Sequence, residues 1–190
     1  PLGDAHMLLF ASHKRGVQYY IGDHAGSKFQ PRRHGRMNFG QFGLESGNLC
    51  AAMTLLDGED RRIMFGWVAE GRTEKLQRKI GWSGIMCLPR VLSLAPDGGL
   101  RVEPIPEVQA LRREHVGLSD RQLLSDLDVP LGAIKGDCLE IEVELDLGGA
   151  SEVGLKVLCS PDETEQTVIT YSRSDSSVAL DVARGSLSED

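Results

Sequence analysis

The chain has 190 residues, which allows one domain or two small ones, and 41% of its residues are hydrophobic, enough to build a core. Its formal net charge of -7 argues against a nucleic-acid partner, because phosphate binding depends on clustered Lys and Arg. No apolar run approaches the roughly 20 residues that a membrane-spanning helix needs, so the sequence predicts no membrane partner.

The cysteines form no recognisable ligand or disulfide pattern. There are four of them and no Cys-x-x-Cys pair, so the sequence predicts neither a zinc site nor a dense disulfide framework. His24 and His34, with Asp23, have a spacing that fits no standard set of metal ligands. We therefore expect no metal, and free thiols buried in β-strands. The cysteines are Cys50, Cys87, Cys138 and Cys159.

The first third of the chain predicts short strands joined by turns. Residues 7–12 and 17–22 are rich in apolar and aromatic side chains, and a turn at 13–16 would join them as a hairpin. A turn at 23–27 leads to a short strand around Phe29, which Pro31 is expected to stop because proline cannot donate a ladder hydrogen bond. The Gly-rich and Arg-rich residues 32–48 predict a long connection.

Two further hairpins are predicted in the middle of the chain. Residues 51–56 and 61–68 flank a turn at 57–60. Residues 71–79 are polar with alternating charge signs, which is typical of an exposed loop. A Pro-Asp-Gly-Gly turn then separates a strand at 85–94 from one at 100–103, and Pro106 is suited to the first position of a short helix.

The C-terminal third predicts antiparallel β-structure. Apolar and acidic residues alternate through 139–147, the period of a strand with one buried face. Shorter strands follow at 153–159, 167–173 and 178–182, and Ser119 is expected to cap a brief helical turn. These strands suggest part of a β-sandwich. Because they are too few for two sheets, we expect a continuation of the chain or another chain to cover their apolar face.

Several short motifs occur in a specific order between residues 61 and 107. They are Arg61-Arg62-Ile63-Met64-Phe65-Gly66-Trp67-Val68, Gly81-Trp82-Ser83-Gly84, Leu88-Pro89-Arg90, Asp97-Gly98-Gly99-Leu100 and Pro104-Ile105-Pro106-Glu107. Together they resemble the final propeller blade and linker of glycoside hydrolase family 32, the invertase, inulinase and levanase family. Tyr19-Tyr20-Ile21-Gly22 and Lys28-Phe29-Gln30-Pro31 resemble two strands of that family's penultimate blade.

The resemblance implies an all-β fold. We expect the last two blades of a five-bladed β-propeller, followed by a partial antiparallel β-sandwich. The corresponding divisions are residues 1–103 for the blades, 104–118 for a linker and 119–190 for the start of the sandwich.

The family's catalytic motifs are absent from this sequence. Family members carry an Asp nucleophile in Asn-Asp-Pro-Asn, a stabilising Asp in Arg-Asp-Pro and a Glu acid/base in Glu-Cys-Pro, and none of these occurs here. The resemblance therefore implies that all three carboxylates lie upstream of Pro1 and that this chain contains no catalytic residue. Asp57, Glu59 and Asp60 are expected to be exposed turn residues. The complete protein would be a retaining β-fructofuranosidase acting on sucrose or fructans without a cofactor.

Five residues are candidates for contact with substrate. His13, Lys14 and Arg15 fall where the resemblance places polar residues that hold the leaving-group sugar, although a plain basic turn would have the same sequence. Trp67 and Glu70 match a Gly-Trp-x-x-Glu segment near the central funnel, where a ring can pack on a sugar and a carboxylate can accept hydroxyl hydrogen bonds. A core role for Trp67 remains the alternative.

Two other functions are compatible with the sequence. One is a non-catalytic carbohydrate-binding or protein-interaction β module. The other is a truncated remnant, in which the remaining propeller segment or another chain would cover the exposed sheets. The upstream coding sequence discriminates between them, because the three catalytic motifs in order would support the enzyme.

Overall fold

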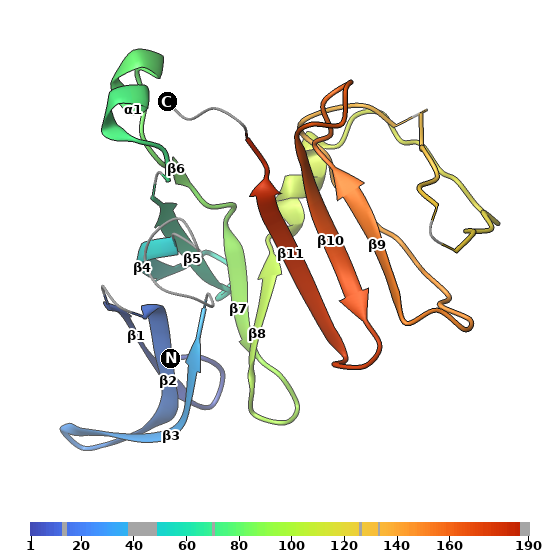
Figure 1. The fold of residues 1–190 in the computed structure, drawn as a ribbon. Helices are drawn as coiled ribbons and strands as arrows, with labels where there is room; N and C mark the ends of the chain where they lie inside the picture. The colour runs from blue at the N-terminus through green and yellow to red at the C-terminus, as the bar shows by residue number, and fades with distance from the viewer. Residues whose placement is uncertain (13–14, 38–48, 70, 126, 133, 187–190) are drawn as a thin grey trace. The chain divides into compact units, whose positions relative to one another are not determined.

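The computed structural model describes residues 1–12, 15–37, 49–69, 71–125, 127–132 and 134–186 (Figure 1). These residues form eleven β-strands, one short α-helix and one 3₁₀-helix, so the chain is all-β. The chain divides into two compact units, residues 1–112 and 113–189.

The first sheet of unit 1 is a three-stranded antiparallel meander. It contains β1 (His6–Ser12), β2 (Gly16–Ala25) and β3 (Lys28–Arg36) in the order β1-β2-β3, which confirms the predicted N-terminal hairpin. The prediction that Pro31 stops the third strand is wrong. β3 is an edge strand, where a missing N–H is tolerated, and the register shifts where Pro31 lies opposite Gly22.

The second sheet of unit 1 has β5 at its centre. β4 (Leu49–Leu56) pairs with β5 (Arg62–Val68) on one side, while β6 (Ile85–Met86) and β7 (Arg90–Leu94) pair with β5 on the other; β8 (Leu100–Pro104) follows β7. The predicted hairpins are confirmed. The single strand expected at 85–94 is instead two strands, because the intervening Pro89 has no N–H for the ladder.

The predicted loop at 71–79 is wrong, since α1 spans Glu74–Ile80. Thr73 caps its N-terminus by accepting a hydrogen bond from the Leu76 N–H at 3.3 Å, and Gly81 ends it with φ of 84°. An ion pair between Arg78 and Glu74 at 2.5 Å joins successive turns. The alternating charges that suggested a loop therefore belong to a short helix that has no buried residue.

The short helix predicted at Pro106 is confirmed as η1 (Pro106–Leu111), with proline in its first turn. It is tied to the β4–β5 turn by Arg61. The Arg61 Nη2 donates to Glu107 Oε1 at 2.6 Å, while its Nε donates to Asp57 Oδ2 at 2.7 Å. One guanidinium thus links two segments that are far apart in the sequence.

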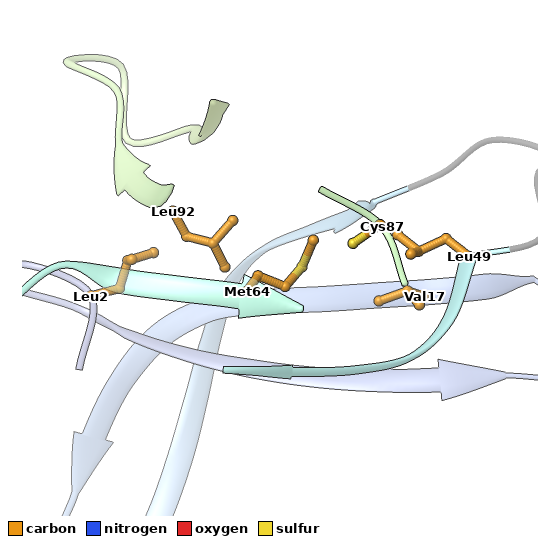
Figure 2. Packing of buried hydrophobic residues seen from close by; sticks show 6 residues of the cluster. All are labelled: Leu2, Val17, Leu49, Met64, Cys87 and Leu92. Carbon is orange, nitrogen blue, oxygen red and sulfur yellow. The ribbon is translucent and has the colours of Figure 1, made fainter. Parts of the chain in front are cut away.

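The core of unit 1 lies between its two sheets (Figure 2). Met64 of β5 and Val17 of β2 are completely buried there. Leu2, Leu49, Cys87 and Leu92 complete the cluster. Because side chains alternate between the faces of a strand, this contact uses only one face of the second sheet.

Unit 2 contains one antiparallel sheet. Its strands are β9 (Glu152–Val157), β10 (Gln166–Ser172) and β11 (Ser177–Arg184), in the order β11-β10-β9, which confirms three predicted strands. The predicted strand at 139–147 is not formed. Alternating apolar and acidic residues indicate that one face of a strand could be buried, but a strand also needs a neighbouring strand to accept and donate its backbone hydrogen bonds. No helical turn follows Ser119 in the described part of 119–125.

The four thiols are free, as predicted, but their burial differs. Cys87 is buried and Cys50 is partly buried in β4, whereas Cys138 and Cys159 are exposed. The expected buried strand positions are therefore wrong for Cys138 and Cys159, which lie in loop segments of unit 2. Cys87 is buried but lies between β6 and β7, not in a strand. Over the described ranges, no helix has the length and apolar character needed to cross a bilayer.

Candidate functional site

Trp67 lies at the end of β5 and on the face opposite the core. Its strand neighbours are Cys50 of β4 and Met86 of β6, so an indole ring, a thiol and a thioether form a row across three strands. Trp67 is 40% exposed. Whether it contacts a sugar or is a core residue of the complete protein stays a prediction.

Gly84 fixes the position of the Trp67 ring. A Cβ at residue 84 would lie 2.1 Å from Trp67 Nε1, and the backbone there has φ of 68°. Only glycine accommodates both the contact and this conformation. Gly84 of the Gly-Trp-Ser-Gly motif therefore makes room for the Trp67 ring, while the motif's own Trp82 is 52% exposed.

A second aromatic group lies beside α1. The guanidinium of Arg72 stacks over the Trp82 ring, 4.4 Å from its centroid. Gln77 of α1 donates to the Arg72 carbonyl at 2.6 Å and accepts from the Ser83 hydroxyl at 2.8 Å. Sequence reasoning missed Arg72, because a stacked cation in a charged stretch has no sequence signal.

Arg15 is exposed in the β1–β2 turn, as its sequence position predicts. Its carbonyl accepts two hydrogen bonds from Arg36, from Nε at 3.1 Å and from Nη2 at 2.7 Å. The backbone of this turn is therefore held to β3. The other candidates, His13, Lys14 and Glu70, lie outside the described residues.

The electrostatics around Trp67 suit binding better than acid–base chemistry. Burial raises the pKa of the Cys50 thiol, which keeps it protonated and a poor nucleophile. Around the β4–β5 turn, burial opposes ionisation of Asp57, but hydrogen bonds from Arg61 and two backbone N–H groups outweigh it and lower its pKa. Arg61 likewise lowers the pKa of Glu107. Both carboxyls are thus poor proton donors.

The residues described here supply no metal centre. No group of three or more His, Cys, Asp or Glu side chains within the described ranges could hold a metal ion. Unit 1 presents the exposed Trp67 indole beside Cys50 and Met86. It also presents the Trp82 indole, on which the Arg72 guanidinium stacks, and the exposed Arg15. These groups can contact a ligand but contain no paired acid and base.

Two family models cover almost the whole chain in order. The model described as the glycosyl hydrolases family 32 N-terminal domain matches residues 4–104, and the model described as glycosyl hydrolases family 32 C terminal matches residues 107–189. The chain belongs to glycosyl hydrolase family 32. Its resemblance to that family, which rested on short motifs, is confirmed.

Curated relatives align with most of this chain. The β-fructofuranosidase insoluble isoenzyme 3 of Oryza sativa subsp. indica is 29% identical over 187 residues, covering 80% of this chain and 32% of the relative. A sucrose-6-phosphate hydrolase of Zymomonas mobilis is 29% identical over 144 residues, covering 73% of this chain and 27% of the relative. The chain therefore spans about a third of the length of these curated relatives.

A solved structure shows the same fold. Fructan 1-exohydrolase IIa from Cichorium intybus aligns with a TM-score of 0.64 at 19% identity, covering 97% of this chain and 46% of that one. At this identity the likeness concerns the fold. It supports an all-β family-32 architecture along nearly the whole chain.

Proposed function

We propose that this chain is a fragment of a longer β-fructofuranosidase-type glycoside hydrolase. The complete enzyme cleaves β-fructofuranosidic bonds of sucrose or fructans with retention, and its catalytic carboxylates precede residue 1. The ordered match to both family-32 models carries the proposal. The absence of the three catalytic motifs from the sequence supports placing the acids upstream.

The second sheet of unit 1 is proposed to be the last blade of a five-bladed propeller. One of its faces packs in the core, and the opposite face exposes a set of large apolar side chains. They are Met53, Leu55 and Met86. Propeller blades pack face to face, so another blade covering this surface would remove the apolar area from water.

The remaining divisions follow the same reasoning. Residues 1–103 form the last two blades, 104–118 the linker and 119–190 the start of a β-sandwich. The three-stranded sheet of unit 2 supports the last division, since Val178, Leu180 and Val182 of β11 are exposed along one face and need a covering layer. That layer comes from the remainder of the protein.

Within the complete enzyme, this chain supplies part of the wall of the sugar pocket. Trp67 packs on a sugar ring and Glu70 accepts hydroxyl hydrogen bonds, while His13, Lys14 and Arg15 approach the leaving-group sugar. The exposure of Trp67 and Arg15 supports this role. The substrate therefore meets residues from this chain and carboxylates from the preceding segment.

The test uses the full-length protein that contains this chain. We expect it to release fructose from sucrose or 1-kestose, with the β-anomer formed first in a proton NMR time course. Trp67→Ala should lower kcat/KM about tenfold or more, because ring stacking is lost, whereas Trp82→Ala should change it far less. A full-length protein that binds these sugars without cleaving them would favour the non-catalytic binding module instead.

A further inference from the structure

We propose that unit 1 contains an anion-binding crevice between its two sheets, built around Arg90 and suited to a phosphate group. The crevice has a volume of about 460 Å³. It is lined by Tyr19 and Arg36 from the first sheet, by Met37, and by Arg90, Leu100 and Val102 from the β7–β8 hairpin. It is separate from the row of side chains around Trp67, and the proposal does not depend on hydrolytic activity.

The two walls of the crevice are held together in the fold. Figure 1 shows β3 beside the β7–β8 hairpin, and Arg33 of β3 forms an ion pair with Asp97 in the turn of that hairpin at 3.4 Å. The Arg33 guanidinium also donates to the Asp97 carbonyl at 3.2 Å. The crevice is therefore a feature of the packed unit and not a gap between independent segments.

Arg90 differs from the other arginines of these strands. Arg32 pairs with Asp23, Arg33 with Asp97, and Arg101 with Glu103. Among the described residues no carboxylate or other acceptor contacts the guanidinium of Arg90, although this side chain is half-buried. Because every buried side-chain nitrogen or oxygen in the described ranges has a partner, the unpaired nitrogens of Arg90 reach solvent and are open to a ligand that supplies an acceptor.

The surroundings of Arg90 specify the sign and shape of that ligand. Arg36 adds a second positive charge to the lining, and no Asp or Glu is among the described residues that line the crevice. A guanidinium can donate two parallel N–H hydrogen bonds to one phosphate, so a phosphate group should bind more tightly than a monatomic anion such as chloride. The apolar side of the crevice, Leu100 and Val102, would contact a carbon skeleton attached to the phosphate.

The thermal stability of the 190-residue chain in phosphate tests the proposal. Against sodium chloride at equal ionic strength, about 20 mM phosphate should raise Tm by about 5 °C in a saturable way, as expected for a Kd on the order of 1 mM. Titration calorimetry should give the same Kd. Absence of a phosphate-specific rise in the unaltered chain would overturn the proposal.

Matched variants identify the site. Arg90→Gln should weaken phosphate binding at least about tenfold. Arg90→Lys should keep part of the phosphate affinity, because lysine keeps the positive charge but lacks the two parallel N–H donors of a guanidinium. Arg101→Gln removes an arginine from the opposite face of β8 and should leave phosphate affinity unchanged. If Arg90→Gln folds poorly, Arg90→Lys carries the comparison, and equal affinity in Arg90→Lys and the unaltered chain contradicts the proposal.

Two probes distinguish the source of the phosphate. Tighter binding of fructose 6-phosphate than of inorganic phosphate assigns the crevice to a sugar phosphate, and equal affinity assigns it to phosphate alone. Both results support an oxyanion site at Arg90. Equal stabilisation by fructose without phosphate would contradict it, since no charge would then be recognised.

Discussion

Arg61 joins the β4–β5 turn to η1 through its charge. It binds Asp57 in the β4–β5 turn and Glu107 at the start of η1. Both carboxyls have pKa values below their ordinary values of 3.8 and 4.5. Because the folded-state values are depressed, their contribution to stability is present above the unfolded values and is lost as the pH falls through the folded values.

This linkage predicts how an Arg61 variant responds to acid. Arg61→Gln should lower the free energy of unfolding at pH 7 and flatten its dependence on pH below about 4.5, where the carboxylates become protonated. Urea unfolding at a series of pH values measures both effects. Arg101→Gln, which removes an exposed pair with Glu103, should leave the pH profile unaltered. Parallel profiles for the Arg61 variant and the unaltered chain would contradict the linkage.

Individual candidate residues could be predicted only as far as local sequence determines their setting. The positions of Trp67 near the end of a strand and of Arg15 in a turn follow from strand and turn patterns. Two features could not be predicted from the sequence: the stacking of Arg72 on Trp82, and the absence of an acceptor beside the Arg90 guanidinium among the described residues. Each depends on which segments meet in three dimensions. His13, Lys14 and Glu70 stay predictions.

At the scale of elements, the errors have physical causes. The cap residues Thr73 and Gly81 were available as helix signals, but the alternating charges between them were given more weight. The 139–147 segment has a strand pattern, yet a pattern of burial does not provide the hydrogen-bonding neighbour that a strand needs. Pro31 was expected to stop the third strand, although an edge strand tolerates proline.

The packing of the two sheets in unit 1 depends on Met64. This side chain is fully buried, so Met64→Ala should reduce the free energy of unfolding by about 2–5 kcal/mol through lost burial and a cavity. Met53→Ala is the matched control, because Met53 is 75% exposed and its truncation should cost under about 0.5 kcal/mol. Chemical unfolding followed by tryptophan fluorescence measures both. Equal losses would show that the sheets do not pack through this position.

At the scale of the whole molecule, unit 1 has two antiparallel sheets, unit 2 has one, and each unit has an exposed apolar surface. In unit 1 that surface is on the second sheet, and in unit 2 it follows β11. The chain spans about a third of the length of its curated relatives, 32% for the rice enzyme. If the proposed propeller and sandwich are formed in the complete protein, exposed sheet faces of this kind are where further blades and a second sandwich layer would pack.

The central claim is that this chain contributes binding surface and architecture to a fructoside hydrolase but none of its catalytic acids. The most direct test is to incubate the purified 190-residue chain with sucrose and to measure released glucose, with the full-length protein at equal molarity as the reference. We expect no glucose above the buffer blank from the chain, because the nucleophile and the proton donor each contribute orders of magnitude to the rate. Release by the chain alone at a rate comparable to the full-length protein would contradict the claim.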